Sequence, residues 1–392
     1  MGVLPSRRRG RARTVLAAAW GAAVIAVSAA ACGSGGNGTS GPAGAAGESG
    51  GTATFALPPA TVPDYIFPFD NRAHFSAVNA QDFQYLMYRP LYWFGDGAPT
   101  LNTSLSLADE PVYRDSSVTI TVKGWRWSNG ETVTAQDVIF WIHMMQAVGS
   151  ASWGAYVPGG FPSNVSSVKA TGPATLTMTM NKRYSPAWFT DNELSQITPM
   201  PLAWDITSVG GKAGSGGCAI SVTRCGKVYA FLDGQSKAIS GWASSSIWSV
   251  VDGPWKLQSF NSDGGSVFVP NKAYSGSPKP RLARFQEIPF ASESAEYDAL
   301  QTGSAGDSQR IDVGYLPTTD APANATTDSN PVSGYTLDPL YSSQGHLPQR
   351  FPAMRQPAGA YRLTEVAGNL RGAARQSAAL GINPESWYFV RG

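Results

Sequence analysis

The chain has 392 residues, with 29 Lys and Arg against 27 Asp and Glu. Five of the basic residues and none of the acidic ones lie in residues 1–31, so the rest carries 24 minus 27, a formal charge of −3. That balance leaves no basic patch to suggest nucleic acid, and we expect no nucleic-acid partner. A chain of this length exceeds one ordinary hydrophobic core, so we expect two or more lobes that can enclose a ligand between them.

Residues 1–31 have the pattern of an export signal. Five arginines precede an uncharged apolar stretch, Val15 to Ala31, that ends in small residues. The stretch is short and mostly alanine, which favours a signal peptide over a membrane-spanning helix. Cys32 then stands where a bacterial lipobox places its lipidated cysteine, although Ala29 occupies the position usually held by leucine. We therefore predict a lipoprotein anchored through Cys32 to the outer face of the cell membrane, on the periplasmic side.

Residues 32–51 are predicted to form a flexible linker after the anchor, because residues 33–51 are nearly all Gly, Ser, Ala, Asn and Thr. The linker contains a G-x-G-x-x-G match at residues 33–38 and a G-x-S-x-G match at residues 47–51. Neither match follows a strand and opens a helix. Neither therefore predicts a dinucleotide site or a nucleophile elbow.

Hydrophobic periodicity beyond the linker predicts a mixed α/β protein. Residues 52–57 alternate as a half-buried strand would, and residues 118–122 and 176–180 alternate apolar residues with threonine. Between the last two segments, Thr134 with Asp137 three residues later predicts the capped start of a helix. Further along, the pattern predicts an α/β unit with a strand at 283–289, a helix at 292–301 and a strand at 311–316.

Cys218 and Cys225 are the cysteines that remain once Cys32 is assigned to the lipid anchor. An even pair, close in sequence and in an oxidising compartment, predicts a disulfide. No histidine lies nearby to complete a zinc site, and no cluster of His, Cys, Asp and Glu has the spacing of metal ligands. We therefore expect no metal and no cofactor.

The most specific stretch is Trp125 to Val138, WRWSNGETVTAQDV, in which Asn129-Gly130 predicts a tight turn directly before the helix. It resembles the W-S-D/N-G-x-x-[LV]-T-A-x-D-V signature of the family 5 extracellular solute-binding proteins, the dipeptide and oligopeptide receptors of ABC importers. The resemblance covers about residues 52–320. Three further stretches resemble family segments in the same order: Tyr88 to Tyr92, Gly253 to Leu257 with Asn271 and Tyr274, and Tyr297 to Gly303 leading to Ile311-Asp312-Val313.

The resemblance implies an α/β fold of the type II periplasmic-binding-protein architecture, in which two lobes close on a ligand. It implies a monomeric receptor that binds a peptide, delivers it to the permease subunits of the importer and performs no covalent chemistry. The same scaffold can hold an oligosaccharide or another solute, since fold does not fix ligand. A secreted hydrolase with paired carboxylates also stays open, because such pairs are matched in space rather than by spacing.

The resemblance also divides the chain after the linker into lobe one at 52–290, the start of lobe two at 291–320, and an atypical tail at 321–392. Family members normally run longer, and the W-G-x-D-x-P-D-P-like segment near their peptide-anchoring aspartate is missing. We therefore expect an incomplete second lobe, a truncated or frame-shifted C-terminus, and a poorly ordered tail beyond about Pro317. Such a fragment would bind peptide weakly or not at all; a native but weakly periodic lobe is the alternative.

Clefts between lobes are lined by aromatic side chains and a few polar groups, which directs attention to loop-like segments of lobe one. Aromatic residues there would cover the ligand, and polar residues would hydrogen-bond to it. No residue is assigned a catalytic role. The candidate ligand-contacting residues are Phe67, Asp70, Asn71, Trp153, Tyr156, Asn192, Glu193 and Trp248.

Overall fold

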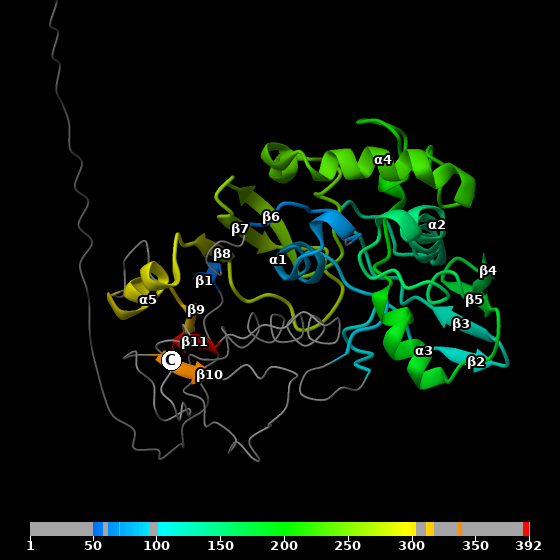
Figure 1. Cartoon of the computed structure of the whole chain (residues 1–392), viewed down its shortest axis with the longest axis horizontal. Coiled ribbons are helices and arrows are strands. Elements are labelled where there is room, and N and C mark those ends of the chain that lie inside the picture. Colours follow the sequence, from blue (N-terminus) through cyan, green and yellow to red (C-terminus); the bar gives the residue numbers. More distant parts are fainter. Residues whose placement is uncertain are drawn as a thin grey trace, which may run out of the picture. The chain divides into compact units, whose positions relative to one another are not determined.

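The computed structural model describes residues 50–57, 62–69, 71–94, 101–302, 311–316, 335–338 and 387–391 (Figure 1). These residues form two β-sheets with helices packed against them. The mixed α/β class expected from the sequence is confirmed. The predicted signal peptide, Cys32 and nearly all of the linker lie outside the described residues.

The larger sheet has seven strands in the order β10-β11-β9-β1-β8-β7-β6. Its first strand in the chain, β1 (Thr52–Leu57), lies between β9 (Val313–Leu316) and β8 (Arg284–Pro289) and runs parallel to both. The strand predictions at 52–57, 283–289 and 311–316 are therefore confirmed. The other neighbours pair antiparallel and are β6 (Trp255–Phe260), β7 (Ser266–Pro270), β10 (Tyr335–Asp338) and β11 (Trp387–Arg391).

The sheet continues across residue 290, where lobe one was expected to end. The carboxylate of Asp312, next to β9, accepts hydrogen bonds from the Thr54 backbone N–H at 2.9 Å and from the Thr54 hydroxyl at 3.0 Å. Helix α5 (Glu293–Thr302) then packs against β9. Because β9 joins β1 in one sheet, no break between sheets marks the boundary, and the division into lobes stays a prediction.

Two strands, β10 and β11, fall within the tail predicted at 321–392. They pair with each other, and β11 pairs with β9. The rest of that range lies outside the described residues, so the predicted poor order of the tail is not tested.

The smaller sheet is antiparallel and follows the order β2-β3-β5-β4. In β5 (Thr175–Met180), Leu176, Met178 and Met180 are buried and the threonines between them are half-buried, as their alternation predicts. These residues share one hydrophobic cluster with the long helix α2 (Ala135–Ser152). The other strands of this sheet are β2 (Val112–Arg114), β3 (Ser117–Thr121) and β4 (Val165–Ala170).

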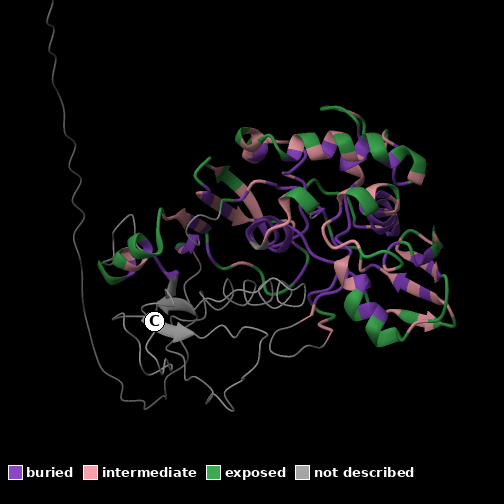
Figure 2. Cartoon of the chain, viewed as in Figure 1, coloured by how far each residue is buried: buried purple, intermediate pink, exposed green. Residues whose placement is uncertain are grey.

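Helix α4 (Cys225–Ser236) lies beside α2 (Figure 1). Its inner side is buried and its outer side is exposed (Figure 2). The predicted disulfide is present and joins Cys218 to Cys225 at the first residue of α4. The remaining helices are short: α1 (Ala77–Asn79), α3 (Pro186–Asn192), the π-helical turn η2 (Ala80–Tyr85), and the 3-10 segments η1 (Arg72–His74), η3 (Leu194–Gln196), η4 (Leu202–Trp204), η5 (Val222–Arg224) and η6 (Ile239–Ser244).

Candidate functional site

Two of the sequence motifs are hydrogen-bonded to each other through their backbones. The N–H of Gly253 donates to the carbonyl of Met87 at 2.8 Å, and the N–H of Trp255 donates to Leu86 at 3.1 Å. The N–H of Arg89 donates to the carboxylate of Asp252 at 3.1 Å. The segment around Tyr88 to Tyr92 is therefore fixed against the segment that begins β6.

The signature stretch joins the same place through Ser128. The Ser128 hydroxyl donates to the Ser249 carbonyl at 2.6 Å, and the Val251 N–H donates back to that hydroxyl at 3.1 Å. The Asn129-Gly130 turn lies beside this contact, and Gly130 has a φ of +92°, a conformation that glycine adopts without strain. We call the meeting point of these segments, residues 86–89, 125–128 and 249–255, the motif junction.

Helix α2 starts directly after the signature turn. Thr134 and Asp137 form the predicted reciprocal cap, in which the Thr134 N–H donates to the Asp137 carboxylate at 2.6 Å. The other carboxylate oxygen of Asp137 accepts the Leu202 N–H at 3.1 Å. One residue thus starts the helix and holds the segment that leads to η4.

Four of the candidate ligand-contacting residues form two close pairs within residues 52–290, the range predicted as lobe one. The rings of Phe67 and Trp248 lie 5.8 Å apart between centroids, and both side chains are 2% exposed. Asn71 forms an antiparallel β-bridge with Trp153, which is 3% exposed. The structure therefore brings Phe67 to Trp248 and Asn71 to Trp153, but it buries all four residues, and contact with a solute stays a prediction.

Asn71 belongs to a polar cluster that ties the segment after β1 to α4. Its side-chain amide donates to the Tyr229 hydroxyl at 2.7 Å and to the Asp233 carboxylate at 3.0 Å. The Tyr65 hydroxyl donates to Asp233 at 2.9 Å, and the Lys237 ammonium lies 2.7 Å from its other oxygen. We call these five residues the Asn71–Asp233 cluster.

The electrostatics of this cluster keep its two tyrosine hydroxyls protonated. Burial, followed by the neighbouring Asp233 carboxylate, raises the pKa of Tyr65 far above its usual value, so its hydroxyl keeps the proton that it donates. Burial likewise raises the pKa of the half-buried Tyr229. Sequence reasoning found Asn71 but missed Tyr229 and Asp233. Their i, i+4 spacing places both on one face of a helix, which is the signal that was available.

Two other candidates, Glu193 and Tyr156, make hydrogen bonds in the loop that follows α2, and a third, Asn192, precedes Glu193 in the chain. Glu193 is 5% exposed and accepts a hydrogen bond from the Asn164 amide at 3.3 Å, and burial raises its pKa. Tyr156 is partly exposed, and its hydroxyl hydrogen-bonds to Ser163 at 3.2 Å. Asn192 is exposed at the end of α3, where its amide donates to the Trp188 carbonyl at 2.9 Å. Among the candidates that the structure describes, Tyr156 and Asn192 are thus the ones whose side chains have solvent access.

The remaining predictions about specific residues concern residues that the structure does not describe. Asp70 and Cys32 are not described, so their predicted roles in ligand contact and lipidation are not tested. Across the described ranges, no group of three or more His, Cys, Asp and Glu side chains is arranged to hold a metal ion. No helix in the same ranges is both long enough and apolar enough to cross a bilayer.

Comparison with solved structures finds similar chains at low sequence identity. The substrate-binding protein CtaP of an ABC transporter from Listeria monocytogenes is 20% identical, with a TM-score of 0.47, over 70% of this chain and 46% of its own. The oligopeptide-binding protein AppA from Bacillus subtilis, in complex with a nonapeptide, is 17% identical, with a TM-score of 0.48, over 70% and 45%. The chain thus spans under half the length of these structures.

A comparison with protein-family models also finds a match. The model for the middle region of bacterial extracellular solute-binding proteins, family 5, matches residues 106–342, which is more than half of the 392 residues. A comparison with curated protein sequences returns no match. The matched region contains the signature stretch, α2, the disulfide and most of the motif junction. The chain belongs to the bacterial extracellular solute-binding proteins of family 5.

Proposed function

We propose that this protein is the extracytoplasmic substrate-binding component of an ABC importer, and that its solute is a peptide. The observation that carries the proposal is the family match over residues 106–342, together with the meeting of three family-like segments in one motif junction. Peptides are the solute class because these segments resemble those of dipeptide and oligopeptide receptors. The protein binds and releases its solute without covalent chemistry and passes it to the permease subunits.

The candidates with solvent access define the part of the site that can be tested first. The Tyr156 ring would cover the peptide, and the Asn192 amide would hydrogen-bond to a backbone carbonyl or N–H group of it. Both side chains make their hydrogen bonds at the surface. Removal of the exposed Asn192 amide should therefore affect affinity rather than folding. The Tyr156 ring also packs against the hydrophobic core, so Tyr156→Ala should cost some stability as well, and the Tm of each variant is measured with its affinity.

Calorimetric titration of the full chain with short peptides and with oligosaccharides tests the solute class. We expect peptide binding that is saturable but weak, because the second lobe is predicted to be incomplete, and we expect Tyr156→Ala to weaken it further by about tenfold or more, since anchoring aromatic residues dominate such contacts. Tyr184→Ala is the matched control, because Tyr184 is a second partly exposed tyrosine, hydrogen-bonded only to Asn181 at the surface.

Three results would contradict parts of the proposal. Saturable oligosaccharide binding without peptide binding would overturn the solute class. Hydrolysis of bound peptide that a single Asp or Glu substitution abolishes would overturn the non-enzymatic role. Absence of any solute effect on tryptophan fluorescence and on Tm would show a fragment that binds nothing.

The proposed anchor has its own experiment. Cys32→Ala should move the protein from the membrane fraction to the medium, because a lipidated cysteine carries the acyl chains that hold it at the bilayer. Retention of the variant in the membrane fraction would show that Cys32 is not the anchor.

A further inference from the structure

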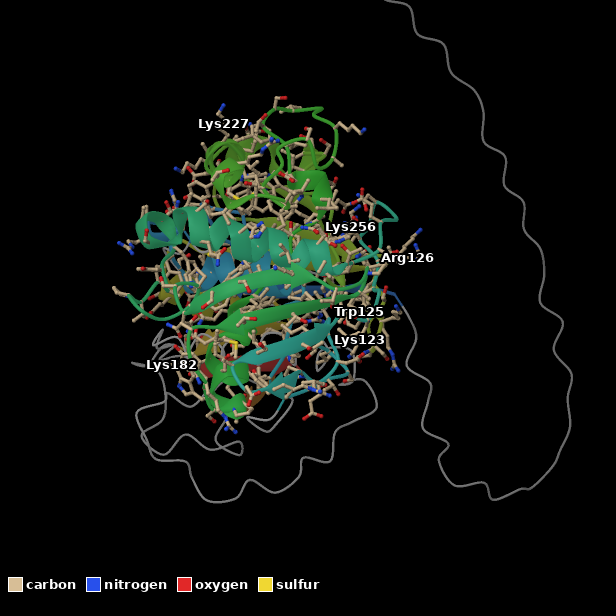
Figure 3. The ribbon with its side chains drawn as sticks, turned by 90° about the vertical axis from the view of Figure 1, so that its right-hand side faces the viewer. Lys123, Trp125, Arg126, Lys182, Lys227 and Lys256 are labelled. Atoms are coloured by element: carbon tan, nitrogen blue, oxygen red, sulfur yellow. A yellow bond between two sulfur atoms is a disulfide. The ribbon has the colours of Figure 1, made fainter. Side chains whose placement is uncertain are left out.

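The segment from η4 to α4 combines positive charge with exposed apolar side chains. Residues 206–232 contain Lys212, Arg224 and Lys227, all exposed, and no Asp or Glu. The chain beyond residue 31 has a formal charge of −3, so this segment is cationic in an otherwise acidic protein. We call it the basic segment. Figure 3 shows Lys227 projecting at one end of the ribbon, far from Lys182 at the other.

Two of the most exposed large apolar residues in the described ranges lie in the basic segment. Ile220 is 80% exposed and Val209 is 68% exposed. Ile220 stands four residues before Arg224 and seven before Lys227, at the turn that enters α4. An exposed branched apolar side chain that is close in sequence to two exposed cations is the combination that suits an interface of headgroups and acyl chains.

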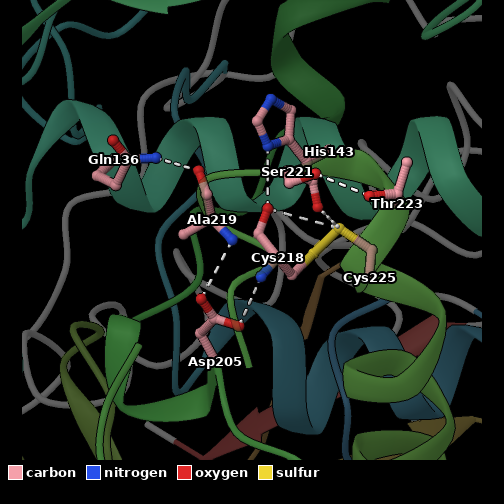
Figure 4. Close-up of a disulfide and its surroundings, with 8 residues drawn as sticks. All are labelled: Gln136, His143, Asp205, Cys218, Ala219, Ser221, Thr223 and Cys225. Atoms are coloured by element: carbon pink, nitrogen blue, oxygen red, sulfur yellow. Dashed lines mark hydrogen bonds between the residues drawn. A yellow bond between two sulfur atoms is a disulfide. The ribbon is translucent and has the colours of Figure 1, made fainter. Parts of the chain in front are cut away.

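The polypeptide that carries Ile220 is held rigidly against α2. The disulfide closes residues 218–225, and the fully buried Asp205 carboxylate accepts the N–H groups of Cys218 at 2.9 Å and Ala219 at 3.2 Å (Figure 4). On the α2 side, His143 hydrogen-bonds to the Cys218 carbonyl at 3.0 Å. Ile220 follows directly, so its exposure is set by a fixed backbone.

The acidic groups near this surface do not oppose the positive charge. Asp205 is buried beneath the loop, and Asp137, the acidic residue of α2, is buried in the helix cap. Asp233 on α4 is paired with Lys237. Arg72 adds another exposed cation beside the end of α2, where its guanidinium donates to the Ser150 carbonyl at 3.4 Å.

We propose that the basic segment docks on anionic lipid headgroups, with Ile220 entering the interface between headgroups and acyl chains. The proposal rests on the proposed function, because the predicted anchor at Cys32 and the 19-residue spacer 33–51 would hold the globular part at a root-mean-square distance of about 25 Å from the bilayer. At that range the basic segment selects which face of the protein meets the membrane. The partner is a phosphate-bearing lipid surface rather than a free anion.

Cosedimentation with lipid vesicles tests this docking without the anchor. The purified Cys32→Ala protein is mixed with vesicles of phosphatidylcholine alone or of phosphatidylcholine and phosphatidylglycerol, at low and at high ionic strength. We expect binding to the phosphatidylglycerol vesicles, weakened by salt. Arg224→Gln with Lys227→Gln should weaken it about 25-fold, since each basic residue near an anionic surface contributes about fivefold.

Matched variants distinguish docking through the basic segment from a general effect of the protein's net charge. Arg114→Gln with Lys169→Gln removes the same two charge types from exposed positions on β2 and β4 of the smaller sheet and should leave vesicle binding within about twofold. Ile220→Ser should weaken binding about threefold or more. Equal losses in both double variants, or equal binding to both vesicle types, would overturn the proposal. Peptide titration of the same proteins tests the proposed function separately, so a failure of membrane docking can be distinguished from a failure of peptide binding.

Discussion

The Tyr274 hydroxyl accepts two hydrogen bonds from the Arg89 guanidinium, at 3.3 Å from Nε and 3.1 Å from Nη2. Arg89 is 2% exposed and Tyr274 is 1% exposed, although the two residues lie 185 positions apart in the chain. The Arg89 guanidinium also lies 4.7 Å from the centre of the Trp93 ring. A charged group is thus held in the core by one phenol and one aromatic face.

Tyr274→Phe should lower the free energy of unfolding by about 2 kcal/mol, because it removes the acceptor of a buried charged donor. Urea denaturation measures the change. Tyr184→Phe removes a hydroxyl whose bond to Asn181 is at the surface and should stay within about 0.5 kcal/mol of the unmodified protein. Similar losses in the free energy of unfolding of the two variants would show that the Arg89 contact stabilises the protein no more than a surface hydrogen bond does.

Gly253→Ala should destabilise the motif junction. A Cβ atom at Gly253 would lie 2.5 Å from the carbonyl carbon of Met87 and 2.6 Å from its oxygen, so the backbone must move. We expect a loss of about 1 to 3 kcal/mol in the free energy of unfolding. The control is Gly226→Ala in α4, which meets nothing within 4 Å and should stabilise the helix by up to about 1 kcal/mol. An unchanged free energy of unfolding in Gly253→Ala would contradict the close approach of Gly253 to the Met87 backbone.

Stability should fall as pH rises above about 4, because of a buried carboxyl pair. Asp82 is 2% exposed and Glu287 is 1% exposed. Burial is the main cause that raises the pKa of both carboxyl groups, and the Glu287 carboxylate further raises the pKa of Asp82. The Ser266 hydroxyl donates a hydrogen bond to Glu287. The folded protein therefore retains protons that the unfolded chain releases. Each retained proton lowers the free energy of unfolding by about 1.4 kcal/mol per pH unit until the folded-state pKa is passed.

Asp82→Asn removes one member of this pair and should flatten the fall of stability with pH, as measured by urea denaturation at a series of pH values. Some slope should remain, since burial also raises the pKa of Asp252 to about 8. A slope identical in Asp82→Asn and in the unmodified protein would contradict proton retention by the pair.

Removal of the disulfide should cost about 2 to 3 kcal/mol, the loop-entropy value for the eight-residue ring that Cys218 and Cys225 close. The double variant Cys218→Ser, Cys225→Ser is compared with the unmodified chain by urea denaturation. Mass analysis after alkylation of non-reduced protein should find neither cysteine modified. Two alkylated thiols at these positions would contradict the bond.

Local features of the chain could be predicted because their causes lie within a few residues. The Thr134 cap, the Asn129-Gly130 turn and the alternation of β5 each follow from neighbours in sequence, and the structure confirms all three. The disulfide could be predicted from cysteine counting. Its setting, with Asp205 beneath the loop, could not, because it depends on how separate segments pack.

The burial of the candidate site residues could not be predicted from the sequence. Phe67, Trp153 and Trp248 stand in loop-like segments rich in aromatic and polar residues, a pattern that a binding surface and a core lining share. Their burial is decided by distant partners such as Trp204, which lies 5.2 Å from Trp248 between ring centroids. The motif junction has the same origin, since Gly253 and Met87 are 166 residues apart, 253 minus 87. Periodicity carries no information over that separation.

The parallel pairing of β1 with β8 joins segments that lie far apart in the chain. Thr52 lies opposite Arg284, which is 232 residues later, 284 minus 52. The smaller sheet joins strands that all lie between residues 112 and 180. Because closing a longer loop costs more conformational entropy, we expect the smaller sheet to form before β1 pairs with β8, wherever the chain folds.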